Sequence, residues 1–312
     1  MINQSVREAY GEALTQLGAG NARVVVLEAD VGSSSQSKLF QSAYPARYFN
    51  MGIAEIGMLC TAAGFAASGK IPFVNTFATF MATRASDPVQ SLIAYNSLNV
   101  KMAGAYCGLS DAYDGASHHS LADVAFMAAL PNMTVVCPMD AVQTRKAVFA
   151  AAALDGPVFL RLSRAAVPVV WREEDAFSIG KGRVLRDGTD VTIVSSGVEV
   201  HQALTAAEIL KTRHISAQVL DMHTVKPLDT PLLTRCAAKT GRVVVAEEHS
   251  AWGGLGAAAA CALAQTRPVP MGFVGLTSFA ESGEYGALLH KYRIDSVAIA
   301  QKCTQLVQGT PR

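Results

Sequence analysis

The chain has 312 residues, of which half are apolar and 16% are charged. That length is enough for two domains, each with its own buried core. The formal net charge is +1, which gives no electrostatic basis for binding nucleic acid or an anionic membrane surface, so we expect neither partner.

The cysteines and the hydrophobic runs bear on where the protein is found. The six cysteines are scattered, without a CxxC pair or a His/Cys cluster at zinc spacing, and we expect them to be buried and reduced. The N-terminus opens with a charged amphipathic segment and does not look like a signal peptide. The Ala-rich runs near Ala150 and Ala257 are too short to span a bilayer. We therefore expect a soluble, cytoplasmic protein.

In the first half, short β-branched runs alternate with helical patterns, which is typical of parallel α/β units. Ser5-Val-Arg-Glu8 predicts a capping box at the start of a helix, and the next strand, over 23–29, ends at Asp30. The further strands predicted here cover 48–51, 71–74, 100–104, 134–137 and 158–161.

The pattern breaks over 167–190, where Pro, Gly and charged residues predict a linker followed by a short hairpin. A second α/β set follows, with strands predicted at 191–195, 217–221 and 242–247 and helices between and after them. We therefore predict an α/β protein with two domains, 1–177 and 178–312.

Ligands in such sheets collect at the carboxyl ends of the strands, so the residues that follow each strand are the candidates for a site. Glu55 comes after a glycine-containing turn and begins a predicted helix. A glutamate at this position is often only a favourable partner of the helix dipole.

The next two candidate segments carry aromatic and titratable side chains. Phe77 and Phe80 are three residues apart and share one helix face, which is usual for core residues but also suits stacking against a flat heteroaromatic ring. In the loop over 106–120, Asp114 and His118 lie four residues apart across a glycine. Such a loop is often only solvated, although this carboxylate and imidazole also suit proton transfer near neutral pH.

Together, the segments NMGIAEIGM (50–58), PFVNTFATF (72–80) and DGASH (114–118) resemble the pyrimidine-binding domain of transketolases. The resemblance continues through Leu130-Pro-Asn-Met133, Cys137-Pro-Met-Asp140 and Leu162-Ser-Arg164. It ends in a C-terminal domain of the transketolase type, with EEHSAWGGLG (247–256) and SFAESGEYGALL (278–289). The resemblance implies a pyrimidine-binding domain with a parallel sheet, followed by a smaller α/β domain.

The resemblance also implies a cofactor, thiamine diphosphate, and residues that bind it. Glu55 matches the catalytic glutamate that hydrogen-bonds the aminopyrimidine ring and favours its imino tautomer, which takes the proton from the thiazolium carbon. Phe77 and Phe80 match the aromatic residues that hold the pyrimidine, and Asp30 matches an aspartate near the bound cofactor.

A second group of residues matches the substrate-binding positions of the family. His118 matches the catalytic imidazole beside the substrate carbonyl, and Asp114 matches the carboxylate that binds the adjacent sugar hydroxyl. The residues that match the substrate phosphate contacts are Arg7, Ser34 and Arg164. Guanidinium groups and a hydroxyl suit a phosphate dianion. For Arg7, a surface helix charge is the alternative interpretation.

Tyr106 departs from the transketolase pattern, which has a phosphate-contacting histidine at this position. A phenol can donate a hydrogen bond to a phosphate or accommodate a different sugar. The departure weakens the expectation that the substrates are ordinary sugar phosphates.

Transketolases bind the cofactor's diphosphate through Mg²⁺ in an N-terminal domain with a GDG motif, and no GDG occurs in this sequence. We therefore expect a partner chain, an N-terminal transketolase subunit that carries the diphosphate and Mg²⁺ site, in an α2β2 assembly. The function implied is the transfer of a two-carbon ketol unit between sugar phosphates by a two-chain transketolase.

Two alternatives stay open at this point. One is the beta subunit of a 2-oxoacid dehydrogenase decarboxylase, although Asp114-Gly-Ala-Ser-His118 and Leu130-Pro-Asn-Met133 are more similar to transketolase. The other is a non-catalytic partner subunit, which has no physical need for Glu55, Phe77 and His118 together with Arg164.

Overall fold

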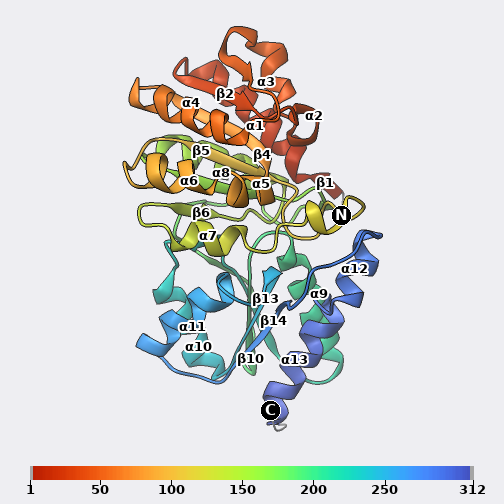
Figure 1. Cartoon of the computed structure of the whole chain (residues 1–312). Helices are drawn as coiled ribbons and strands as arrows, with labels where there is room; N and C mark the ends of the chain where they lie inside the picture. The colour runs from red at the N-terminus through yellow and green to blue at the C-terminus, as the bar shows by residue number, and fades with distance from the viewer. Residues whose placement is uncertain (1–2, 310–312) are drawn as a thin grey trace.

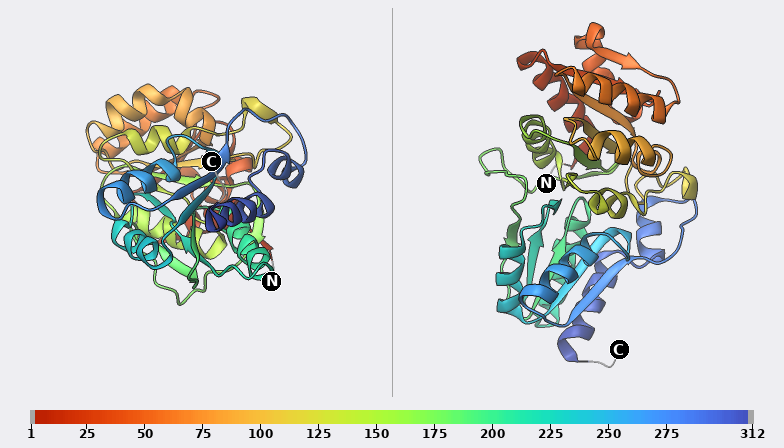
Figure 2. Two further views of the ribbon diagram at one scale, coloured as in Figure 1. Left: turned by 90° about the horizontal axis from the view of Figure 1, so that it is seen from below. Right: turned by 60° about the vertical axis from the view of Figure 1, so that its left-hand side comes forward.

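The computed structural model describes residues 3–309. It consists of two stacked α/β parts, the first coloured red to green and the second cyan to blue (Figure 1), and Figure 2 shows the same two parts from below and from the side. Parallel pairing dominates both main sheets, so the predicted fold class, α/β with parallel sheets, is confirmed.

The first part is built on a seven-stranded sheet with the order β12-β6-β7-β5-β4-β2-β3. Six of its strands come from residues 24–162, namely β2 (Val24–Glu28), β3 (Tyr48–Asn50), β4 (Ile71–Phe77), β5 (Lys101–Ala105), β6 (Thr134–Val136) and β7 (Val158–Leu162). Each lies where the β-branched runs predict a strand.

Helices cover both faces of this sheet. They are α1 (Val6–Gly20), α2 (Gly32–Ser35), α3 (Lys38–Ala43), η1 (Pro45–Arg47), α4 (Glu55–Ala67), α5 (Ala78–Thr83), α6 (Ser86–Pro88), η2 (Val89–Ala94), η3 (Gly115–Ser117), α7 (Asp123–Ala129) and α8 (Ala141–Ala153). Alternate residues of β2 enter different cores: Val24 and Val26 pack on the side of α1 and α8, and Val25 and Leu27 pack on the side of α4. The Ser5 hydroxyl accepts a hydrogen bond from Glu8 N at 3.3 Å, which confirms the predicted start of α1.

The second part contains a five-stranded sheet with the order β14-β13-β10-β11-β9. Its strands are β9 (Arg183–Arg186), β10 (Val191–Ser195), β11 (Ala217–Asp221), β13 (Val243–Ser250) and β14 (Met271–Leu276). Its helices are α9 (Glu199–Thr212), α10 (Thr230–Thr240), α11 (Leu255–Thr266), α12 (Tyr285–Lys291) and α13 (Ser296–Gln308).

The hairpin expected within 167–190 is wrong. The strand β8 (Ala166–Pro168) pairs antiparallel with β1 (Asn3–Ser5), which lies about 160 residues earlier in the sequence. The strand β9 pairs antiparallel with β11 in the second sheet. Each short strand therefore finds a partner far away in the sequence instead of folding back on the other.

One strand from the second half of the chain belongs to the sheet of the first part. The strand β12 (Thr224–Lys226) belongs to the second half of the chain but pairs antiparallel with β6, at the edge of the first sheet. The Lys226 Nζ donates to the carbonyl oxygen of Ala128 at 2.9 Å, on the same edge. The strand β12 therefore joins the two parts through backbone hydrogen bonds.

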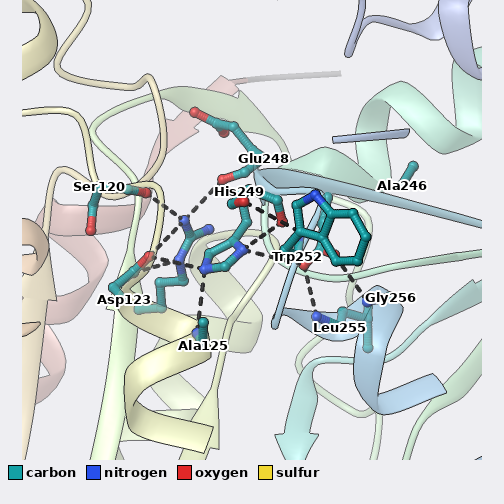
Figure 3. A network of polar contacts seen from close by, with 12 residues as sticks. Ser120, Asp123, Ala125, Ala246, Glu248, His249, Trp252, Leu255 and Gly256 are labelled. Atoms are coloured by element: carbon teal, nitrogen blue, oxygen red, sulfur yellow. Dashed lines mark hydrogen bonds and ion pairs between the residues drawn. The ribbon is translucent and has the colours of Figure 1, made fainter. Parts of the chain in front are cut away.

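A buried charged network also crosses between the two parts (Figure 3). Arg161, on β7, donates to both carboxylate oxygens of Asp123, at 2.7 and 3.2 Å, and to the carbonyl oxygen of Glu248, on β13, at 2.9 Å. The Glu248 carboxylate in turn accepts from Leu109 N at 2.6 Å and from the Tyr285 hydroxyl at 2.8 Å. Burial raises the pKa of Glu248 to about 7.

Several predictions from composition concern the chain as a whole. All six cysteines are free, but Cys60 and Cys261 are exposed, so the expectation of buried thiols is wrong for these two. Within residues 3–309, no helix is long and apolar enough to cross a membrane. The same residues contain no group of three or more His, Cys, Asp or Glu side chains that could hold a metal ion.

Candidate active site

Glu55 is the first residue of α4, directly after the turn that leaves β3. Its side chain is buried although it lies at a helix start, where a carboxylate meets the positive end of the helix dipole. Its Oε1 lies 3.4 Å from Nη1 of Arg84. The structure therefore places the predicted catalytic carboxyl group in a protected position at the carboxyl edge of the first sheet.

Three rings gather near this edge. Phe77 ends β4 and Phe80 lies one turn later on α5, with their ring centroids 5.6 Å apart. The His118 imidazole, from the loop after β5, meets both rings edge-on at 5.5 and 5.1 Å. The structure therefore brings the three predicted residues together at this edge.

The His118 ring is also oriented by a hydrogen bond. Its Nδ1 pairs with the Ser117 hydroxyl at 2.9 Å. Within the described part of the chain no other hydrogen bond holds the ring, so Nε2 is the nitrogen available to a bound molecule. A neutral or protonated imidazole at such a position can donate a hydrogen bond or move a proton.

Tyr106 connects the rings to the arginines. It follows β5 with a φ of 59°, a left-handed backbone that is unusual for a bulky residue and is found often at functional sites. Its ring stacks on Phe77 with centroids 4.9 Å apart, and its hydroxyl accepts from Arg7 Nη1 at 2.9 Å. The Arg164 guanidinium lies 5.1 Å from the centre of the same ring.

Ser34 joins this arginine group through its backbone. Arg7 Nη1 donates to the Ser34 carbonyl oxygen at 3.3 Å, whereas the prediction concerned the hydroxyl. The short helix α2 that carries Ser34 is held by the buried Glu28 carboxylate, which accepts from Val31 N and from the Ser35 hydroxyl. Burial raises the pKa of Glu28 to about 7.

The structure thus brings together the predicted phosphate-contacting side chains Arg7 and Arg164, the backbone of Ser34, and Tyr106. Arg7 and Arg164 both line a cavity of about 580 Å³. The remaining predicted residues lie around this group. Asp30 is exposed at the carboxyl end of β2 and accepts from the Asn50 side chain at 2.9 Å. Asp114 is exposed and precedes η3.

Sequence reasoning missed two charged residues of this site. The Arg84 guanidinium lies 3.6 Å from the centre of the Phe80 ring while it contacts Glu55, so it covers both groups. Its spacing of four residues from Phe80 on a helix is the only sequence signal for this contact. Asp111 pairs with Arg164 at 3.0 Å, and this contact has no signal in the sequence because 53 residues separate the two.

Comparison with known families shows the family to which the chain belongs. Residues 3–170 match the family described as "Transketolase, pyrimidine binding domain", and residues 180–299 match "Transketolase, C-terminal domain". The chain therefore belongs to the transketolase family, as the resemblance of its motifs predicts. The matches do not favour the alternative of a 2-oxoacid dehydrogenase beta subunit.

Two similar proteins have nearly the same length as this chain. A transketolase C-terminal section from Methanocaldococcus jannaschii is 39% identical over 305 residues, which cover 96% of each chain. The 6-deoxy-6-sulfo-D-fructose transketolase subunit SqwH of Clostridium sp. (strain MSTE9) is 40% identical and covers 97% of this chain and 94% of that protein. Human transketolase is 36% identical, but the chain spans only 49% of its length.

Solved structures agree with this assignment. A split gene transketolase, described as an inactive beta4 tetramer, superposes with a TM-score of 0.89 at 44% identity and covers 97% of this chain and 98% of that one. The transketolase of Campylobacter jejuni, at 20% identity and a TM-score of 0.82, shows the same fold over 46% of its chain.

Proposed function

We propose that this chain is one subunit of a two-chain, thiamine diphosphate-dependent transketolase that transfers a two-carbon ketol unit from a ketose to an aldose. One observation carries the proposal: Glu55, the Phe77 and Phe80 pair and His118 come from three separate segments and lie together at one sheet edge. The similarity to a transketolase C-terminal section over nearly the whole chain supports it further.

The described residues fit the pyrimidine half of the cofactor. The Phe77 and Phe80 rings offer the apolar faces that a flat heteroaromatic ring requires, and the buried Glu55 carboxyl group offers a hydrogen bond to a ring nitrogen. Arg84 contacts both Glu55 and Phe80, so the pyrimidine would replace it there. When bound, thiamine diphosphate supplies the nucleophilic thiazolium carbon that takes up the two-carbon unit.

The other site residues would hold and orient the sugar. His118 Nε2 would donate a hydrogen bond to the reacting oxygen, and the Asp114 carboxylate would accept one from the adjacent hydroxyl. Arg7, Arg164 and the Tyr106 hydroxyl would hold an anionic group at the far end of the sugar. Charge-assisted hydrogen bonds of this kind fix the substrate's register against the reacting carbon.

Two kinds of terminal group on the substrate would suit this end of the site. Phosphate is the terminal group that the family resemblance implies. The similar SqwH subunit is named for a sugar with a sulfo group, and Tyr106 stands where the family pattern has a histidine. We therefore propose that the substrates are ketoses and aldoses with an anionic terminal group, either phosphate or sulfonate.

The exposed face of α4 supports a partner chain next to the site. Ile53 and Ile56 are 75% and 56% exposed beside Glu55, and Gly57, Cys60 and Gly64 continue the same exposed stripe along the helix. A helix that is apolar on all sides is normally buried, so this face requires a cover. We propose that an N-terminal transketolase subunit covers it, carries the diphosphate and Mg²⁺ site, and forms an α2β2 assembly with this chain.

Two further features belong to the proposal. We place the division between the two domains at residues 177 and 178, in the segment between β8 and β9. We place the enzyme in the cytoplasm, a compartment that suits six free cysteines.

The test compares the purified chain with its reconstituted two-chain complex. We expect the chain alone to show no ketol transfer and only weak thiamine diphosphate binding by calorimetry, and the complex to show both activities. In the complex, Glu55→Gln should slow deuterium exchange at the thiazolium carbon about 10²–10⁴-fold. Sub-micromolar cofactor binding by the chain alone would contradict the two-chain proposal.

A matched variant controls for the loss of any helix-start carboxylate. Glu284 precedes α12, where its exposed carboxylate caps the helix through Ala287 N. Glu284→Gln should leave the exchange rate within about twofold of the parent, because the capping acceptor is retained. An unchanged rate in Glu55→Gln would mean that another residue activates the cofactor.

A further inference from the structure

The buried Asp111 carboxylate pairs with Arg164, one of the two arginines proposed to bind the substrate's anionic group. The Asp111 side chain is fully buried (0% exposed), whereas its partner Arg164 is 41% exposed, and the Oδ1 of Asp111 lies 3.0 Å from Nη1 of Arg164. The Oδ2 of Asp111 is buried with no hydrogen-bond partner among the described residues. The partly exposed Arg164 guanidinium is thus held by a buried carboxylate.

The backbone around this pair keeps it in place. Arg164 N donates to the Ser110 hydroxyl at 3.1 Å, and that hydroxyl donates to the Cys107 carbonyl oxygen at 2.6 Å. Asp114 N donates to the Asp111 carbonyl oxygen at 2.9 Å, so the two carboxylates lie on one tight turn. Burial, followed by the nearby Asp114 carboxylate, raises the pKa of Asp111 to about 6, whereas the Arg164 guanidinium beside it lowers the pKa and favours the ionised form.

These charges decide how strongly the far end of the site attracts an anion. Arg7 and Arg164 contribute two positive charges at this end, and Asp111, which is paired with Arg164, contributes one negative charge. The cavity that the two arginines share is also lined by Glu8, Glu12 and Arg145. A phosphate monoester carries close to two negative charges at neutral pH, and Asp111 both repels it and competes with it for Arg164. A sulfonate carries one negative charge and has three acceptor oxygens, so it meets half of this repulsion with the same hydrogen bonds.

We propose that Asp111 is a positioning residue that holds Arg164 and lowers the positive charge of this end, so that the site selects a singly charged terminal group such as a sulfonate over a phosphate dianion. This selection rests on the function proposed above and names the substrate class for it. Tyr106 agrees with the proposal, because a neutral phenol adds a hydrogen-bond donor without adding charge.

The test uses the reconstituted two-chain complex with three ketoses that differ only in their terminal group: phosphate, sulfonate and hydroxyl. Asp111→Asn keeps a hydrogen-bond acceptor for Arg164 and removes the charge, whereas Asp111→Ala removes both. For Asp111→Asn we expect the ratio of kcat/KM for the phosphate to that for the sulfonate to rise about 5- to 20-fold. For Asp111→Ala we expect both anionic substrates to lose efficiency relative to the hydroxyl ketose, because Arg164 is no longer held.

The control variant is Glu208→Gln, which neutralises a carboxylate paired with Arg186 on the surface of the second part. It should leave the phosphate-to-sulfonate ratio unchanged. An unchanged ratio in Asp111→Asn, with a loss for both anions in Asp111→Ala, would overturn charge selection, because Asp111 would then only hold Arg164.

A binding measurement separates this proposal from the proposed function. Inorganic phosphate and methanesulfonate are titrated into the parent complex and into Asp111→Asn by calorimetry, with no ketose present. We expect the variant to gain about 5- to 20-fold in phosphate affinity relative to methanesulfonate, and an equal change for both anions would overturn the proposal. A complex that transfers no ketol unit from any ketose, but shows this gain, would contradict the proposed function and leave the charge selection standing.

Discussion

The Arg161 network allows a quantitative prediction about how the two parts are held together. Arg161 is 7% exposed and makes four hydrogen bonds, two of them to the fully buried Asp123 carboxylate. In Arg161→Met the aliphatic bulk stays, but Asp123 keeps a buried charge without its partner. Breaking a buried pair from one side costs about 3–5 kcal/mol.

That loss should be visible as a lower melting temperature. In chains of this size one kcal/mol corresponds to roughly 2–3 °C, so Arg161→Met should melt about 6–15 °C below the parent in scanning calorimetry at pH 7.5. The double variant Arg161→Met/Asp123→Leu removes both charges and should recover much of the loss. Arg186→Met, which breaks the surface pair with Glu208, should cost less than about 1 kcal/mol. A loss below 1 kcal/mol in Arg161→Met, or a double variant less stable than the single one, would refute this reasoning.

Three further predictions concern the same junction and the cofactor pocket. Gly108 has a φ of 61°, and an added Cβ would overlap the Glu248 carboxylate. We therefore expect Gly108→Ala to lower the free energy of unfolding, measured in urea, by about 2–4 kcal/mol, and a change below about 0.5 kcal/mol would contradict this. Burial raises the pKa of Glu248 to about 7, so the folded chain holds a proton that the unfolded chain releases near pH 4.5, and stability falls as the pH rises from about 5 to 7. The free energy of unfolding of Glu248→Gln minus that of the parent should therefore be larger at pH 8 than at pH 5. An equal difference at the two pH values would count against this. Arg84→Ala frees Glu55 and Phe80 and should tighten thiamine diphosphate binding by the complex about 3- to 10-fold, whereas weaker binding would mean that Arg84 holds the cofactor.

The sheets could be predicted where strands are buried on both faces. Continuous apolar runs such as 191–195 and 217–221 match β10 and β11 residue for residue. The strand β14 was not predicted, because Met271-Gly-Phe-Val-Gly-Leu276 is interrupted by glycines that normally weaken a strand. The hairpin expected near 167–190 is wrong because local turn chemistry carries no information about distant pairing partners.

The candidate site could be predicted for residues that belong to contiguous motifs. Glu55 follows β3 and Phe77 is the last residue of β4, so the predicted strands place both at the carboxyl edge of the sheet. Their roles came from the family resemblance. Asp111 and Arg84 could not be predicted, since their contacts with Arg164 and Glu55 span 53 and 29 residues and depend on how the chain folds back.

The strand β12 has a consequence for how the protein is made. Thr224 pairs with Val136, so the outer edge of β6 stays unpaired until roughly 90 further residues have left the ribosome. At about 5–20 residues per second this takes about 5–20 s, a period in which an open strand edge can pair with another nascent chain. Synthesis of the first part alone would extend that exposure indefinitely. The second part therefore covers this strand edge only once residues 224–226 have been synthesised.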